Sequence, residues 1–284
     1  MIWKIRGREI DCSKTLLMGI VNVTRDSFSD GGQYFDRDRA IRHADNLIEQ
    51  GADILDLGAE STRPGADPVP QEEELERLLP VLGHLRKTCK IPISIDTTKP
   101  GVARQCFQAG ADIVNDVSGF GETGAEMAEA VKAFGAGWIL MHRRGDPKTM
   151  QSLAHYDNPV EEVLRELGES TAKALRTGVM PEQLAVDPGL GFAKTAEQSL
   201  ELLRHLDRFR DFGLPVVLGH SRKSFIGQWT GREVSEREFG NAAASAFAVL
   251  KGVQVLRVHD VAGTRDVVRV AERLRQSDCA AKPG

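Results

Sequence analysis

The feature of this sequence that most constrains its fold is an alternation, repeated eight times, of a short apolar run with a longer helical stretch. We expect strands at residues 16–22, 52–59, 92–97, 112–117, 138–142, 184–187, 215–219 and 254–259. Strands that alternate with helices are joined by crossovers and therefore run parallel. Eight such units in 284 residues predict an α/β protein with a (β/α)8 barrel, and an open doubly wound sheet is the alternative.

The stretches between the expected strands have the spacing of amphipathic helices. One apolar stripe consists of Ala40, Ile41, Ala44, Leu47 and Ile48, and a second of Leu75, Leu78, Leu79, Leu82 and Leu85. Pro80 falls inside the second stripe, so we expect a kink there. Residues 1–14 alternate around Gly7 and predict a small β-hairpin at the lower end of the barrel. Without a linker or an internal repeat, residues 1–284 are expected to form a single domain.

The composition argues against several classes of protein. The net charge of −4 and the scattered basic residues argue against a nucleic-acid or membrane surface. No apolar run approaches the roughly 20 residues of a membrane span, and residues 1–14 lack the apolar stretch of a signal peptide. The four cysteines (Cys12, Cys89, Cys106 and Cys279) are widely spaced, which argues against a zinc site or disulfide framework. We therefore expect a cytoplasmic globular protein.

Every expected strand ends in polar residues. In a (β/α)8 barrel the carboxyl ends of the strands and the loops after them form the active site. The residues at these ends are Asn22, Glu60, Thr62, Arg63, Asp96, Asn115, Asp116, His142, Asp187, Ser221, Lys223, Arg257 and His259. Each one alone could cap a helix or form a turn. Together at one mouth they predict a shared binding site.

The strand-end residues divide into two chemical groups. Asp96, Asn115 and Asp187 suit a flat heterocycle that presents an amino group beside a ring N–H. The cations and donors suit a phosphate or carboxylate group, and they are Arg63, Lys223, Arg257 and His259. The segments "STRPG" and "GHSRKSFIG" place glycine, serine and a basic residue where a helix could begin, which favours an anion.

Two aromatic residues and two histidines complete this set of candidates. Phe192, in "DPGLGF", and Phe28 are the loop aromatics best placed to cover a planar ring, and a place in the core is an equal alternative for both. His142 and His220 are expected to be hydrogen-bonded structural groups rather than catalytic ones.

Seven segments of the chain resemble, in the same order, the signatures of the dihydropteroate synthase family. They are "MGIVNVTRDSFSDGG", "GAESTRPGA", "SIDTTKPGVA", "IVNDVSG", "DPGLGFAKT", "GHSRKSFIG" and "RVHDV". The resemblance implies a TIM-barrel transferase of folate biosynthesis. Such an enzyme joins the dihydropterin-methyl group of a pterin diphosphate to 4-aminobenzoate and releases diphosphate. It also implies a homodimer and a target of sulfonamides.

The resemblance also implies a role for each matching residue. The pterin edge would be held by Asp96, Asn115, Asp187 and Lys223, and the diphosphate pocket would be lined by Thr62, Arg63, Arg257 and His259. Aminobenzoate would be received by Thr62, Pro64, Phe192 and Ser224. Asn22 would ligate Mg²⁺ on the diphosphate, and the catalytic residues would be Asp96, Lys223 and Arg257. The loop of residues 23–32 would close over the site and exclude water from a reactive pterin cation.

The chain departs from the usual family pattern at four positions, none of which is assigned to ligand contact. Arg25 replaces a proline, Arg143 an apolar or neutral residue, Asp146 a threonine and Ala193 a glycine.

Two other functions are compatible with a pterin-binding barrel. A corrinoid-linked methyltransferase would share the acid and amide groups, but it has no obvious need for the cations, and this chain has no appended cobalamin-binding domain. A non-catalytic paralogue would be expected to lack some of Asn22, Asp96, Asp187, Lys223 or Arg257, all of which are present.

Overall fold

Eight parallel strands form the centre of the computed structural model, which describes residues 1–23, 32–63 and 65–280. The strands are β3 (Leu16–Asn22), β4 (Ile54–Gly58), β5 (Ile93–Asp96), β6 (Ile113–Asp116), β7 (Gly137–Met141), β8 (Leu184–Asp187), β9 (Val217–Gly219) and β10 (Val255–Val258). They lie in the order β8-β7-β6-β5-β4-β3-β10-β9. A parallel bridge between Val186 and Val216 joins the two ends of this order. The sheet is therefore a closed barrel, and the open-sheet alternative is wrong.

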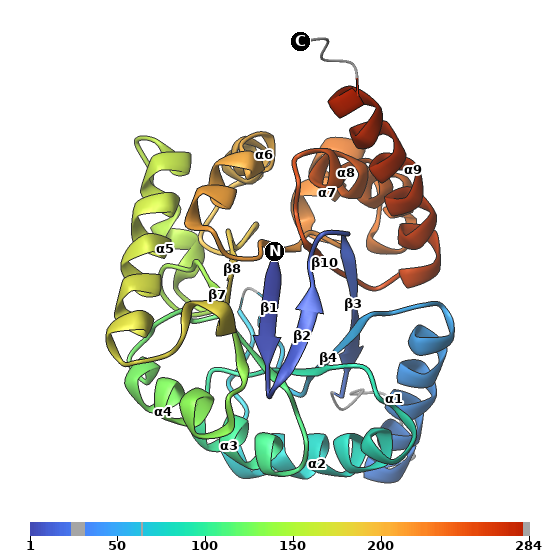
Figure 1. The fold of residues 1–284 in the computed structure, drawn as a ribbon, viewed down its shortest axis with the longest axis vertical. Coiled ribbons are helices and arrows are strands. Elements are labelled where there is room, and N and C mark those ends of the chain that lie inside the picture. The colour runs from blue at the N-terminus through green and yellow to red at the C-terminus, as the bar shows by residue number, and fades with distance from the viewer. Residues whose placement is uncertain (24–31, 64, 281–284) are drawn as a thin grey trace.

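Helices surround the barrel on its outside (Figure 1). They are α1 (Gly32–Glu49), α2 (Gln71–Thr88), α3 (Pro100–Gln108), α4 (Gly124–Phe134), α5 (Pro159–Arg176), α6 (Ala196–Arg204), α7 (Ser224–Thr230), α8 (Glu238–Leu250) and α9 (Val261–Ala280). Four short 3-10 turns join them: η1 (Met150–Leu153), η2 (Pro181–Gln183), η3 (Leu206–Phe212) and η4 (Val234–Glu236). The apolar faces of the helices pack on the outer faces of the strands in one continuous core.

Helix α2 shows how sequence sets one of these elements. Its first turn carries Glu72, Glu73 and Glu74, and its last turn carries Arg86 and Lys87, so both ends complement the helix dipole. Its buried stripe is the one expected from the sequence. Pro80 lies exposed inside α2, which continues through it as one element, so the proline does not divide the helix.

The predicted hairpin closes the amino end of the barrel. Strands β1 (Ile2–Ile5) and β2 (Arg8–Asp11) are antiparallel, and Figure 1 shows them across the middle of the ring of helices. Trp3 and Ile5 are fully buried against inward-facing residues of the strands, among them Ile54 and Ile113 at strand starts. Trp3 Nε1 donates to the carbonyl of Gln183 at 2.9 Å. The hairpin lies at the lower end of the barrel, as the sequence predicted. We call it the plug, and its buried tryptophan is both well packed and hydrogen-bonded.

In the part of the chain that the structure describes, no helix is both long and apolar enough to cross a bilayer.

Candidate active site at the carboxyl end of the barrel

The register of the sheet aligns several predicted site residues in one row. Asn22 lies opposite Gly58, Gly58 opposite Asp96, and Asp96 opposite Asn115. The row crosses four neighbouring strands, β3 to β6, at their carboxyl ends. Gly58 has no side chain in this row, and a Cβ atom there would lie 3.4 Å from the Cβ of Asp96. The row therefore places an amide on each side of the Asp96 carboxylate, with Asn115 directly beside it and Asn22 beyond Gly58.

Arg257 lies on β10, outside this row, and connects to it through ion pairs. Its Nε donates to Asp56 Oδ2 at 2.6 Å, and its Nη2 donates to Asp96 Oδ2 at 2.7 Å. Asn115 Nδ2 also donates to Asp56 Oδ2, at 3.2 Å. Asp56 is fully buried and Arg257 is 21% exposed. Four residues from four strands thus form one charged cluster below the mouth.

The sequence analysis missed Asp56. It lies inside the apolar run "ILDLG" of β4, where the pattern indicated only a buried strand. A charged residue inside such a run is the signal that could have identified it, because a buried acid needs a partner. Asp56 supplies that partner for both Arg257 and Asn115.

Burial and charge set the protonation of this cluster. Burial raises the pKa of Asp96 to about 7, against the opposing effect of Arg257, and the nearby Asp56 adds to the increase. Burial alone would lower the pKa of Arg257, but the two carboxylates reverse this, so its pKa is raised and it stays charged. The cluster therefore combines a permanent cation with an acid that titrates near neutral pH.

Two carboxylate oxygens in this cluster lack partners. Asp56 Oδ1 and Asp96 Oδ1 are buried, and neither accepts a hydrogen bond from any described residue. An unpaired buried acceptor is unfavourable, typically by about 1–3 kcal/mol and by more for a charged group. A ligand that brings N–H donors into the mouth would satisfy these atoms.

Asp187 and Lys223 are two further charged residues at the mouth, and each influences the pKa of the other. Asp187 Oδ1 accepts from the Gly189 amide at 2.7 Å, and burial raises the pKa of Asp187 although Lys223 opposes this. Lys223 Nζ donates to the carbonyl of Leu190 and lies 4.6 Å from the centre of the Phe192 ring. Burial lowers the pKa of Lys223 to about 8, although Asp187 opposes the decrease. Lys223, which follows β9, is thus held against the loop after β8, near the carboxylate of Asp187 and the ring of Phe192.

The side of the mouth that was predicted to bind an anion contains His259. Its Nδ1 lies 2.9 Å from the hydroxyl of Ser221. Burial, Arg222 and Arg257 lower the pKa of His259 to about 3, and the charge of Arg63 contributes. His259 is therefore a neutral imidazole among cations, able to donate one N–H and carrying no charge itself.

The remaining predicted residues lie around the mouth rather than in the charged cluster. Thr62 is half-buried, Arg63 is exposed in the loop after β4, Asn22 is exposed at the end of β3, and Ser224 is exposed as the first residue of α7. Among the described residues, no hydrogen bond or ion pair joins Asn22, Thr62 or Ser224 to the cluster. Pro64, Arg25, Phe28 and most of the proposed closing loop (24–31) lie outside the described residues.

Some strand-end residues have structural partners instead. Glu60 pairs with Lys99, which also pairs with Glu74 at 2.8 Å. Asp116 accepts from the backbone and hydroxyl of Ser118 at 2.9 and 2.5 Å. These residues fix the loops at the mouth rather than face into it.

The two strand-end histidines differ. His142 Nε2 lies 3.0 Å from Glu166, and its Nδ1 lies 2.8 Å from Lys194 Nζ, so the prediction of a hydrogen-bonded structural group is confirmed for it. His220 Nε2 meets the hydroxyl of Ser245 at 2.7 Å, but its buried Nδ1 has no partner among the described residues. The same prediction is therefore only half right for His220.

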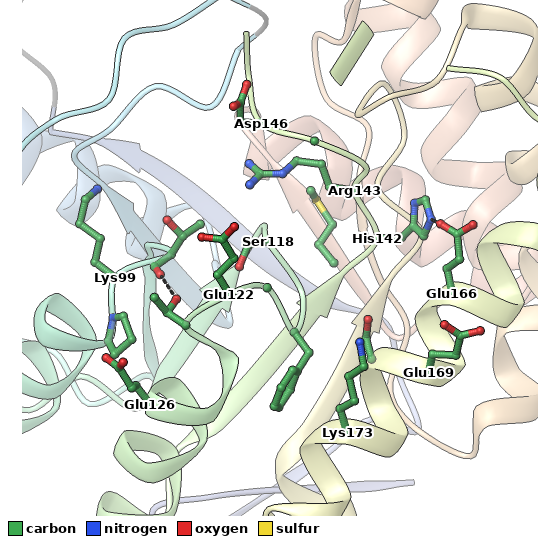
Figure 2. A pocket seen from close by; sticks show the side chains of 18 of the residues that line it. Lys99, Ser118, Glu122, Glu126, His142, Arg143, Asp146, Glu166, Glu169 and Lys173 are labelled. Carbon is green, nitrogen blue, oxygen red and sulfur yellow. Dashed lines mark hydrogen bonds and ion pairs between the residues drawn. The ribbon is translucent and has the colours of Figure 1, made fainter. Parts of the chain in front are cut away.

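A cavity of about 910 Å³ lies beside the mouth, between the loops that follow β5, β6 and β7. Figure 2 shows side chains of both charges around it, from Lys99 on one side to Glu166 and Lys173 on the other. Arg143 and Asp146, two of the departures from the family pattern, line this cavity. Its lining does not include Asp96, Asp187, Lys223 or Arg257, so it is separate from the charged cluster.

Comparison with known proteins agrees with this fold. The sequence model of the family described as "Pterin binding enzyme" matches residues 18–259. The dihydropteroate synthase of Synechocystis is 45% identical over 262 residues, covering 92% of this chain and 90% of that protein. The dihydropteroate synthase of Escherichia coli K12 is 43% identical over 267 residues, covering 94% of each.

Solved structures extend the similarity to three dimensions. The Yersinia pestis dihydropteroate synthase in a sulfonamide complex has a TM-score of 0.90 and 37% identity, covering 98% of this chain and all of that one. The Xanthomonas albilineans dihydropteroate synthase with 4-aminobenzoic acid has a TM-score of 0.89 and 41% identity, covering all of both chains.

The closed (β/α)8 barrel and the family match over residues 18–259 define the class of protein, a pterin-binding enzyme. The chain belongs to the dihydropteroate synthase family of pterin-binding enzymes.

Proposed function

We propose that this protein makes dihydropteroate. It would transfer the dihydropterin-methyl group of (7,8-dihydropterin-6-yl)methyl diphosphate to the amine of 4-aminobenzoate and release diphosphate. The observation that carries the proposal is the pair of buried, unpartnered carboxylate oxygens on Asp56 and Asp96 beside the charged Arg257. The four relatives named above are all dihydropteroate synthases, which favours this activity over a corrinoid-linked methyltransferase or a non-catalytic paralogue.

The pterin ring would lie across the mouth with its donor edge toward the acids. An amino group beside a ring N–H matches a carboxylate through two charge-assisted hydrogen bonds, and we assign this role to Asp187. Asn115 and Asp96, adjacent in the sheet register, would meet the opposite edge of the ring. Lys223, whose ammonium lies over Phe192, would meet the oxo and ring-nitrogen side.

The reaction breaks the bond between the pterin methylene carbon and the diphosphate oxygen. The electron pair leaves with diphosphate, and the positive charge on the methylene spreads into the electron-rich ring. The amine of 4-aminobenzoate then forms the new C–N bond and loses a proton. Asp96, fixed by Arg257 at 2.7 Å, is placed to stabilise the positive charge as it develops.

The leaving diphosphate would be bound on the other side of the mouth. Arg63 and Arg257 supply positive charge there, and Thr62 and His259 supply neutral hydrogen-bond donors. A neutral His259 fits this pocket because it donates one N–H, and its hydrogen bond with Ser221 fixes the orientation of its ring.

A Mg²⁺ ion fits the donor available at Asn22. Mg²⁺ in such sites keeps several waters and takes one or two protein oxygens together with the oxygens of a substrate phosphate. Asn22 is exposed at the carboxyl end of β3 and offers a single amide oxygen, so it would hold the ion only with substrate present. Bound there, the ion would neutralise charge on the leaving diphosphate.

Aminobenzoate would bind where the loops after β4, β8 and β9 meet. Ser224 begins α7, and Thr62 and Phe192 are half-buried on the neighbouring loops. Pro64, the fourth residue that we assign to this ligand, adjoins Thr62 and Arg63 in sequence.

We also propose that the protein works as a homodimer in the cytoplasm. Large apolar side chains are exposed on α7 and α8, including Trp229 at 55%, Phe239 at 91% and Phe247 at 38%. Exposed aromatic residues grouped on adjacent elements favour a protein–protein contact. Cys12, Cys89 and Cys106 are buried free thiols, which is compatible with a reducing compartment.

The direct test of the activity is diphosphate release by the purified protein, with pterin diphosphate and Mg²⁺, in the presence and absence of 4-aminobenzoate. We expect release that depends on the amine and yields a pteroate product. Release that ignores the amine, or no release, would contradict the proposal.

A further inference from the structure

The segment of residues 221–224, between β9 and α7, has an unfavourable backbone conformation. Arg222 has a φ of 60°, in the left-handed region where a Cβ atom clashes with the backbone. Arg222 is also exposed, so its own side chain does not pack the segment in place. Other groups must therefore stabilise this conformation, and it immediately precedes Lys223 and Ser224.

The groups that hold this segment come from the end of η4 and from α8. The amide of Arg222 donates to Asn241 Oδ1 at 2.9 Å. Arg237 Nη1 donates to the carbonyl of Arg222 at 3.0 Å and to that of Lys223 at 3.3 Å. Arg237 Nε donates in addition to the carbonyl of Arg232 at 3.1 Å. One guanidinium thus donates to three backbone carbonyls, two just before α7 and one just after it.

The same guanidinium packs directly against α7. A Cβ atom added at Gly227 would lie 2.1 Å from Nη2 of Arg237, so only glycine leaves room for this contact. Gly227 is buried in the middle of the helix, where glycine is otherwise unfavourable. Arg237 and Gly227 therefore form a matched pair, a guanidinium and the space that accommodates it.

We propose that Arg237 and Asn241 are positioning residues for 4-aminobenzoate. They hold residues 222–224 so that Ser224 and the backbone of Lys223 are fixed where this ligand binds. The inference rests on the proposed function. The pterin depends less on this segment, because Asp96, Asn115 and Asp187 hold it from three other strands. The Lys223 ammonium, which also meets the pterin, is held separately by the Leu190 carbonyl and the Phe192 ring of the loop after β8.

The first test is Arg237→Met, which removes the donors and keeps an apolar stem. We expect the KM for 4-aminobenzoate to rise about tenfold, the scale of one lost hydrogen bond from a charged group. The affinity for 6-hydroxymethylpterin, measured by calorimetry, should stay within about twofold of the wild type. A merely destabilised protein would not separate the two ligands in this way.

The second test is Gly227→Ala, which displaces the guanidinium without removing it. The higher helix propensity of alanine offsets part of the lost hydrogen bonding, so we expect the variant to fold with a small change in melting temperature while the KM for 4-aminobenzoate rises as in Arg237→Met. This variant decides the matter if Arg237→Met does not fold. Arg232→Gln is the matched control, an exposed arginine between α7 and η4 whose side chain pairs only weakly with Glu236 at 3.9 Å. It should keep the wild-type KM.

The inference is overturned if Gly227→Ala keeps the wild-type KM, or if pterin affinity falls in parallel with it. Failure of the proposed function has a different signature, because the wild-type protein itself would then show no amine-dependent release of diphosphate.

Discussion

The two ends of the barrel are built from the same eight strands and differ in how well their buried groups are satisfied. At the amino end, Trp3 and Ile5 pack among apolar side chains, and the Trp3 indole has its hydrogen-bond partner. At the carboxyl end, Asp56 and Asp96 each bury a carboxylate oxygen that has no partner among the residues that the structure describes. The amino end thus stabilises the fold, while the carboxyl end keeps unsatisfied groups that a ligand can complete.

This comparison predicts opposite outcomes for substitutions at the two ends. Changes at the amino end should lower stability and leave binding intact. Changes at the carboxyl end should remove binding with little loss of stability, or with a gain.

The largest effect is expected at the carboxyl end for Asp187→Asn. The amide keeps the size of the side chain but cannot accept two hydrogen bonds from the pterin edge, each worth about 1.5–3 kcal/mol. We expect a 6-hydroxymethylpterin affinity lower by about 10²–10⁴-fold in calorimetry and an unchanged or higher melting temperature. Near-wild-type affinity would remove Asp187 from the pterin site.

The counterpart at the amino end is Trp3→Ala. Removing a fully buried indole should lower the free energy of unfolding by about 3–5 kcal/mol, measured by urea denaturation. Pterin affinity below the unfolding transition should be unchanged. A large loss of affinity in the folded variant would show that the two ends are not independent.

A smaller effect is expected in the pH dependence of Asp96→Asn. Because the pKa of Asp96 is about 7 in the fold and near 3.8 when unfolded, the folded state holds a proton that the unfolded chain has lost. Stability from this group is therefore present below about pH 4 and is lost as the pH rises to about 7.

Asparagine has no such proton to lose. Relative to the wild type, Asp96→Asn should thus gain on the order of 1–2 kcal/mol in unfolding free energy between pH 5 and pH 7. Using this difference cancels the contributions of other titrating groups, including His142 and His259. Parallel pH profiles for the two proteins would contradict the raised pKa of Asp96.

The smallest effect is expected for Trp3→Phe. The phenyl ring keeps most of the apolar burial but leaves the Gln183 carbonyl without its donor. We expect a loss of about 1 kcal/mol in unfolding free energy, and unchanged enzyme kinetics. A loss as large as that of Trp3→Ala would mean that the hydrogen bond, rather than packing, holds the plug.

The sequence predicted the elements well because their signals are local. All eight barrel strands lie within two residues of the predicted bounds, since β-branched runs between helical stripes are distinctive. Trp3 and Ile5 were expected in a hairpin because residues 1–14 alternate around Gly7.

The contacts within the site were less predictable because they depend on register and on distant partners. The row from Asn22 to Asn115 is set by strand register, and a list of the residues at the strand ends does not reveal how the strands are aligned with one another. The ion pair of Arg257 with Asp56 joins residues 201 positions apart. Asp56 was missed for this reason, since its role appears only when β10 and β4 lie on the two sides of β3 in the folded sheet.

The most direct measurement for this account is a crystal structure of the protein with bound dihydropteroate. We expect the pterin ring at the carboxyl ends of the strands, with its amino edge on Asp187 and its opposite edge within hydrogen-bonding distance of Asp96 or Asn115. A ring bound in the neighbouring cavity beside Arg143, or away from Asp187, would contradict it.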